Sequence, residues 1–199
     1  MLKDRFFYPL AALLAIGMVA FALSFGVTTD VTDREIWCKG YLMTGEDLTR
    51  LAAQPGTQAV FVSASGKEPD YARLTSTVAR ASINPKPGIF APLGPNYERA
   101  FATRRLRLTI TARSSAVKGL EAFDMGYFTA GSGDSDWNRR ALTPDWEDYV
   151  MEYTPGALSD VQGLDHFSIW PGETAELLNM DVRDMRVEVL DPPTTCPPD

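Results

Sequence analysis

The chain has 199 residues and a formal net charge of −7, with 26 acidic residues against 19 basic ones. This acidity argues against nucleic acid or an anionic lipid surface as the partner, because each of these is itself negatively charged. An acidic surface instead tolerates or attracts a basic protein, or it serves only to keep the domain soluble.

Residues 6–25 form an apolar run without a charged side chain, FFYPLAALLAIGMVAFALSF. A helix of this length, at about 1.5 Å of rise per residue, spans roughly the 30 Å hydrocarbon core of a bilayer. The run therefore predicts a transmembrane anchor within residues 1–26, a stalk over residues 27–43 and one domain over residues 44–199. The alternative is a cleaved secretory signal, but the run is longer than the ~7–15 apolar residues usual for such a signal.

Charges on the two sides of this run predict its orientation. Lys3 and Arg5 precede it, whereas Asp30, Asp33 and Glu35 follow it. The side with more basic charge usually stays in the cytoplasm. We therefore expect a single-pass protein of the bacterial inner membrane, with a cytoplasmic N-terminus and a periplasmic domain.

Small side chains within the predicted anchor permit close approach of another helix. They are Ala12, Ala15, Gly17 and Ala20. These positions are candidate contacts with integral membrane protein subunits, and the alternative is that they simply face the lipid bilayer.

The chain has two cysteines, Cys38 and Cys196, near the two ends of the predicted exported part. Disulfides persist in oxidising compartments such as the periplasm. We therefore expect these cysteines to form one disulfide, and the alternative is two free thiols.

The predicted elements begin with a short helix at Thr44–Ala53, which ends at Pro55-Gly56. The signals that follow are those of β-strands, and the clearest is Arg105–Arg113. There Leu106, Leu108 and Ile110 alternate with polar residues, so one face of the strand is expected to be buried. Further strands are expected at 57–65, 71–82, 122–130, 146–154, 166–170 and 185–189.

This succession of short strands, without the helical periodicity of βαβ units, predicts an all-β antiparallel sandwich. Residues 84–98, NPKPGIFAPLGPNYE, are rich in proline. Proline cannot donate to a sheet ladder, so this segment is expected to cross the surface or to lie along an edge.

The second half of the domain carries two patterns of a known fold. One is a threonine-proline-x-tryptophan step followed by a tyrosine, at Thr143, Pro144, Trp146 and Tyr149. The other is an aspartate-valine-x-aspartate approach to the closing strand, at Asp181, Val182 and Asp184.

With these patterns, residues 101–191 resemble carbohydrate-binding-module-like jelly rolls of the galactose-binding-like type. The resemblance implies a jelly-roll sandwich. It does not specify a ligand, because the aromatic platform that binds sugar lies in variable loops of that group.

Candidates for chemistry are few. His166 is the sole histidine, which excludes a metal site built from several histidines. Asp134, Asp136 and Asn138 have the spacing of a calcium loop, but Arg139 stands where such a loop needs glycine. They are a weak calcium site, and the resemblance implies that a structural calcium occurs in some of these jelly rolls. No other cofactor is indicated.

Two non-catalytic functions are therefore indicated by the sequence. The first is a membrane-anchored accessory subunit of a larger bacterial membrane complex, such as a photosynthetic or respiratory assembly. Its contacts with the partner are expected at four apolar residues, Ile89, Phe90, Leu93 and Trp137. The alternative is a membrane-tethered module that binds carbohydrate or peptidoglycan.

Overall fold

The computed structural model describes residues 31–80, 88–160, 163–172 and 176–196, together with Leu14, Gly17 and Met18. Contacts divide the chain into residues 1–31 and a compact unit of residues 32–199. We call the second unit the domain.

The predicted anchor lies almost entirely outside the described residues, as do Ala12, Ala15 and Ala20. Gly17 is helical and exposed. Among the helices of the described ranges, none is long and apolar enough to cross a membrane. The anchor, its orientation and the inner-membrane location therefore stay predictions.

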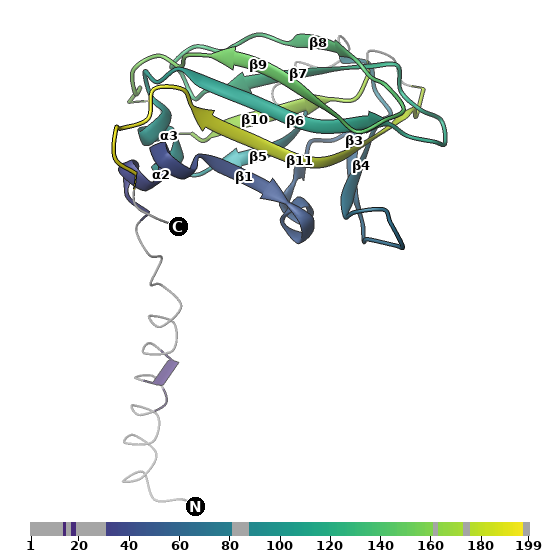
Figure 1. Cartoon of the computed structure of the whole chain (residues 1–199), viewed down its shortest axis with the longest axis horizontal. Helices are drawn as coiled ribbons and strands as arrows, with labels where there is room; N and C mark the ends of the chain where they lie inside the picture. Colours follow the sequence, from purple (N-terminus) through teal and green to yellow (C-terminus); the bar gives the residue numbers. More distant parts are fainter. Residues whose placement is uncertain are drawn as a thin grey trace, which may run out of the picture. The chain divides into compact units, whose positions relative to one another are not determined.

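The strands pair antiparallel in two sheets, which are drawn one over the other in Figure 1. Sheet A has the order β3-β4-β11-β6-β9, and β1 also pairs with β11. Its strands are β1 (Tyr41–Thr44), β3 (Thr57–Val62), β4 (Tyr71–Ser76), β6 (Leu106–Ser114), β9 (Glu147–Tyr153) and β11 (Asn179–Val189). Sheet B has the order β2-β5-β10-β7-β8. Its strands are β2 (Ala52–Ala53), β5 (Ile89–Leu93), β7 (Ala122–Phe128), β8 (Asn138–Ala141) and β10 (Asp165–Trp170). The all-β antiparallel sandwich is thus confirmed.

Alternation along the strands fills the core between the sheets. In β6, Leu106, Leu108 and Ile110 are fully buried, as predicted. In sheet B the corresponding residues include Phe123 of β7 and Phe167 of β10. Burying each large apolar side chain contributes about 1.5–3 kcal/mol relative to leaving it in water, so this layer supplies the main stabilising term.

The domain begins earlier than the predicted boundary at residue 44. Helix α2 (Asp33–Lys39) opens with a capping box, in which Thr32 and Glu35 satisfy each other's backbone N–H groups. Its Ile36 is buried in the core. Most of the segment predicted as a stalk therefore belongs to the domain.

Two further helical segments differ from the expectation. The predicted helix at Thr44–Ala53 is a 3-10 helix, η1 (Gly45–Arg50), and it follows β1 instead of preceding the first strand. Helix α3 (Pro95–Phe101) starts with proline at its first turn, where the missing N–H costs little. It lies beside α2 (Figure 1), and the Trp37 indole donates a 2.6 Å hydrogen bond to the Ala100 carbonyl.

Cys38 in α2 and Cys196 in the C-terminal tail form a disulfide, with 5.5 Å between their Cα atoms. Nearby, Arg34 donates 2.6 Å hydrogen bonds to both the carbonyl and the hydroxyl of Thr195. The predicted pairing is confirmed, and the alternative of two free thiols is wrong.

The proline-rich segment contains a strand that the sequence did not predict. Ile89 to Leu93 form β5, which pairs fully with β10 on one side and with only two residues of β2 on the other. Ile89 and Leu93 point into the core and are fully buried. The expectation that these two residues form an exposed interface is therefore wrong.

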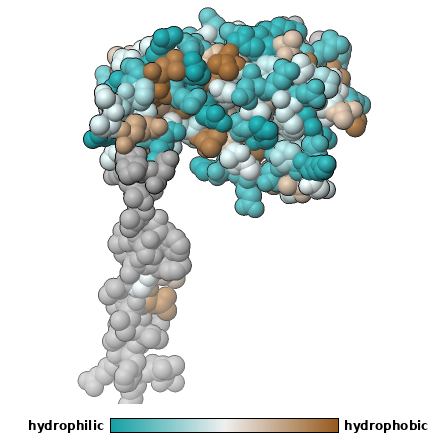
Figure 2. Space-filling view, in the orientation of Figure 1, coloured by the Kyte–Doolittle hydropathy of each residue, from teal (hydrophilic) through white to brown (hydrophobic). Residues whose placement is uncertain are grey.

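The face drawn in Figure 2 is mainly hydrophilic, with hydrophobic residues standing apart from one another. Solitary apolar residues on a surface are normal and do not mark an interface.

Candidate functional site

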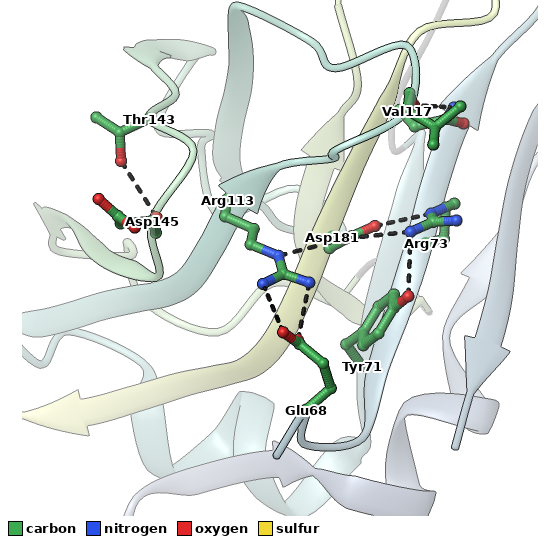
Figure 3. Close-up of polar contacts among 9 residues, drawn as sticks. Glu68, Tyr71, Arg73, Arg113, Val117, Thr143, Asp145 and Asp181 are labelled. Carbon is green, nitrogen blue, oxygen red and sulfur yellow. Dashed lines mark hydrogen bonds and ion pairs between the residues drawn. The ribbon is translucent and has the colours of Figure 1, made fainter. Parts of the chain in front are cut away.

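The outer face of sheet A carries a dense network of ion pairs (Figure 3). Asp181 of β11 is fully buried and pairs with Arg73 of β4 at 2.8 Å and with Arg113 of β6 at 3.4 Å. Arg113 also pairs with Glu68 at 2.9 Å, and Arg73 donates a 3.0 Å hydrogen bond to the Tyr71 hydroxyl. Each polar side chain of this group has a protein partner.

Trp146 also belongs to this outer face and is only partly buried. The Arg113 guanidinium lies 4.3 Å above the Trp146 ring and the Arg183 guanidinium 5.8 Å from it. Such cation–π contacts stabilise the arrangement. The outer face of sheet A is therefore internally satisfied and offers few groups to a ligand.

The outer face of sheet B has a different composition. In β5, β7 and β10 the core-facing positions include Ile89, Phe123 and Phe167. Because successive side chains of a strand point to opposite faces, Phe90 of β5, His166 and Trp170 of β10 and Phe128 of β7 lie on the outer face. His166 is directly opposite Phe128 in the ladder. Trp137, which immediately precedes β8, joins them.

These five rings form what we call the aromatic face. The Phe90 and His166 rings meet edge to face at 4.6 Å, and both side chains are half-buried. The half-buried Trp137 lies 4.6 Å from Phe128 and 6.3 Å from Trp170, measured between ring centroids. Phe128 and Trp170 lie beneath it and are buried.

Two buried polar groups of the aromatic face lack hydrogen bonds among the described residues. The Ser168 hydroxyl and the Trp170 indole N–H are buried and have no hydrogen-bond partner within the part of the chain that the structure describes. A buried donor left unpaired costs about 1–3 kcal/mol, so such groups are uncommon and require an explanation. Beside them, Arg80 forms a 3.2 Å ion pair with the buried Asp124 and lies 6.0 Å from the Trp137 ring.

Of the residues of this face, the sequence analysis named Phe90 and Trp137 as contact candidates and His166 as the sole histidine. Phe128, Trp170 and Asp124 were missed, although their alternation with buried neighbours in DMGYF and HFSIW was visible in the sequence. What the sequence could not show is that β5, β10 and β7 are neighbours in one sheet.

His166 and Ser168 are two positions apart on β10 and therefore share this face. They do not form a hydrogen bond, because the Ser168 hydroxyl is unpaired. Burial lowers the pKa of His166. The pair therefore lacks the contact by which a base activates a hydroxyl nucleophile.

The weak calcium candidates lie in the β7–β8 connection and at the start of β8. The Asp134 carboxylate accepts a 3.0 Å hydrogen bond from the Thr129 N–H, and Asn138 pairs with Met125 in the β7–β8 ladder. Among the described residues, no three His, Cys, Asp or Glu side chains gather as metal ligands would.

A pocket of about 370 Å³ opens where β7 begins, beside Arg139 of β8 and Gly172 after β10. Its charged lining residues are Glu121, Arg139 and Glu176. Arg139 stands directly opposite Asp124 in the ladder, so this pocket continues the outer face of sheet B at the Trp170 end.

No protein-family model matches the sequence, and no curated protein resembles it at a significant level. Among solved structures, the domain is similar to the C-terminal family 22 carbohydrate-binding module of Clostridium thermocellum Xyn10B, with a TM-score of 0.53 and 15% identity. That match covers 79% of this chain and 96% of the module, in which cleft residues take part in ligand binding.

The CBM22-2 xylan-binding domain of Paenibacillus barcinonensis Xyn10C is also similar, with a TM-score of 0.53 and 10% identity. The match covers 75% of this chain and 98% of that domain. At such identities the likeness concerns the fold. The chain has the jelly-roll β-sandwich fold of carbohydrate-binding modules, which confirms the resemblance seen in residues 101–191.

Proposed function

We propose that the domain is a non-catalytic module that binds a β-linked glycan on the aromatic face, tethered to the membrane by residues 6–25. The observation that carries this proposal is the grouping of five aromatic rings on one sheet face, three of them half-exposed. The fold likeness to carbohydrate-binding modules supports it.

The chemistry of this face suits a sugar. Aromatic rings offer flat apolar surfaces, and the C–H face of a pyranose is itself flat and apolar. Sugar hydroxyls need a few well-placed polar partners between such surfaces. Arg80, whose side chain is partly exposed, stands next to the rings and offers its guanidinium to such hydroxyls.

The first hypothesis from the sequence, an accessory subunit of a membrane complex, gains no support from the described residues. Two of its four contact residues in the domain, Ile89 and Leu93, are core residues. The other two, Phe90 and Trp137, belong to the aromatic face and are accounted for by glycan binding.

The test uses the full chain in mild detergent, with soluble xylan in a native affinity gel and peptidoglycan sacculi in a pull-down assay. We expect retention by at least one of these polymers. Phe90→Ala should weaken binding about tenfold, because losing one stacking contact costs about 1.4 kcal/mol.

Trp146→Ala is the matched control, since it removes an aromatic ring from the outer face of the opposite sheet. It should leave binding unchanged, and circular dichroism should show both variants folded. If the wild type binds neither polymer, or if both variants lose affinity equally, the proposal is wrong.

A further inference from the structure

The aromatic face has an uncovered half and a covered half. Phe90 and His166, on β5 and β10, are half-exposed. On β7, in contrast, Phe128 is buried beneath Trp137, and the loop that connects β7 to β8 folds back over the strand. The covered half limits which part of a glycan chain can bind at this site. This inference rests on the proposed glycan-binding function.

The loop backbone lies directly on the middle of β7. Gly126 faces outward there, opposite Ser168 of β10. A Cβ atom on Gly126 would come within 2.9 Å of the Asp136 carbonyl oxygen and equally close to the Phe128 ring. The space above β7 is therefore filled by the chain itself, and it is not part of an open groove.

Hydrogen bonds hold the loop in this place. The Ser135 N–H donates to the Tyr127 carbonyl at 2.9 Å, and the Ser135 hydroxyl accepts from the Tyr127 N–H at 2.7 Å. At the base of the loop, the Thr129 N–H donates to Asp134 at 3.0 Å and the Thr129 hydroxyl to the Gly133 carbonyl at 2.6 Å. The Gly156 N–H also donates to the Ser132 carbonyl at 2.9 Å, which ties the loop to the segment after β9.

Trp137 completes the obstruction. Its ring contacts Phe128 and Trp170, which would otherwise continue the stacking surface from β10 across to β7. The chain's own indole thus occupies the position where the next sugar ring of a long glycan would stack.

From this geometry we infer that residues 129–137 form a wall, so that the site takes the end of a glycan chain and excludes its interior. A glycan lies on Phe90 and His166 over β5 and β10, and its terminal unit stops against Trp137. An internal stretch of polymer cannot pass over β7 without displacing this loop.

The test compares each polymer, xylan and peptidoglycan, before and after limited cleavage that multiplies the chain ends at constant mass. The full-length protein is titrated, and the readout is binding capacity in moles per gram of polymer. We expect the capacity of the polymer that binds to rise in proportion to its number of chain ends.

Two variants open the wall in different ways. Trp137→Ala removes the obstructing ring, and Gly126→Ala pushes the Asp136 carbonyl away from β7. Each should raise the capacity of the uncleaved polymer and make capacity independent of chain ends, whereas Trp146→Ala should behave like the wild type.

The outcomes separate the two proposals. If cleavage leaves wild-type capacity unchanged while Phe90→Ala still weakens binding, the module binds glycan but the wall is wrong. The wall is equally wrong if both Trp137→Ala and Gly126→Ala reduce the capacity of the uncleaved polymer. Absence of binding by the wild type to either polymer overturns the glycan function and the wall together.

Discussion

At the scale of single residues, the Asp165–Tyr127 pair is the most informative buried polar contact. The Tyr127 hydroxyl donates a 2.6 Å hydrogen bond to the Asp165 carboxylate, at the start of β10 and inside the sandwich. Burial raises the pKa of Asp165 to about 6, opposed by the hydrogen bond from Tyr127 and reinforced by the charges of Glu98 and Asp134. Burial is also the main cause that raises the pKa of Tyr127.

This pair predicts a specific pH dependence of stability. An unfolded aspartate has a pKa of about 3.9, so the folded state binds the proton more tightly than the unfolded state does. Protonated Asp165 therefore stabilises the fold fully below about pH 4, and this contribution is lost as the pH rises through about 6.

Asp165→Asn should remove this pH-dependent loss of stability, which amounts to about 3 kcal/mol. The check is urea unfolding at several pH values from acidic to neutral, comparing the variant with the wild type. Tyr127→Phe should move the transition to higher pH, because it removes a hydrogen bond that lowers the pKa of Asp165. Parallel profiles for the wild type and Asp165→Asn would contradict this role of the carboxyl group.

At the scale of elements, β11 organises sheet A. It pairs with β6 along its length on one side and with β4 and β1 on the other. The buried Asp181 lies on β11 between Arg73 of β4 and Arg113 of β6. One carboxylate thus links three neighbouring strands on their outer face.

Removing that carboxylate should be costly. Asp181→Asn leaves two guanidinium groups without their shared counter-charge in a partly buried place, so we expect a loss of about 2–3 kcal/mol in the free energy of unfolding. The control is Asp191→Asn, whose pair with Arg104 is exposed and should be worth less than about 1 kcal/mol. Urea unfolding of both variants measures the difference, and equal small losses would refute the structural role of Asp181.

Individual strands also show which elements could be predicted from the sequence and which could not. The β6 strand was predicted because Leu106, Leu108 and Ile110 alternate with polar residues without interruption. β5 was missed because Pro92 hid an equally regular alternation of Ile89, Ala91 and Leu93. Pro92 lies beyond the two residues of β5 that pair with β2, so on that side no ladder bond is lost.

Elsewhere a local sequence motif was overlooked, whereas contacts between residues far apart in the sequence could not be predicted. The capping box of α2 was legible as Thr32 followed three residues later by Glu35. The aromatic face was not, because Phe90, Phe128 and Trp170 meet only through the order of strands in sheet B. A strand order depends on long-range pairing that one sequence does not display.

At the scale of the whole domain, the disulfide closes a loop that contains nearly all of it. Cys38 and Cys196 are 158 positions apart. In the chain-entropy model a loop of this length stabilises the fold by about 5 kcal/mol, chiefly by restricting the unfolded chain.

Replacing both cysteines by serine should therefore lower the thermal midpoint while leaving the β-sheet circular dichroism spectrum of the folded state intact. A reducing agent should destabilise the wild type to the same extent and should have no effect on the double variant. An unchanged midpoint in the double variant would show that the tail contributes nothing to the stability of the domain.

The same cross-link decides how the domain carries tension. A pull on the chain at Thr32 reaches Cys38 first, and from there it follows two covalent routes, one into β1 and one across sulfur into the end of β11. Tyr41 at the start of β1 pairs with Val187 near the end of β11, so both strands are loaded from the same end and move together instead of being peeled apart. The force then spreads over the ladders of β11 with β4 and β6. A domain held on one side by a polymer and on the other by its own N-terminal segment would bear that load through its most extensively paired strand.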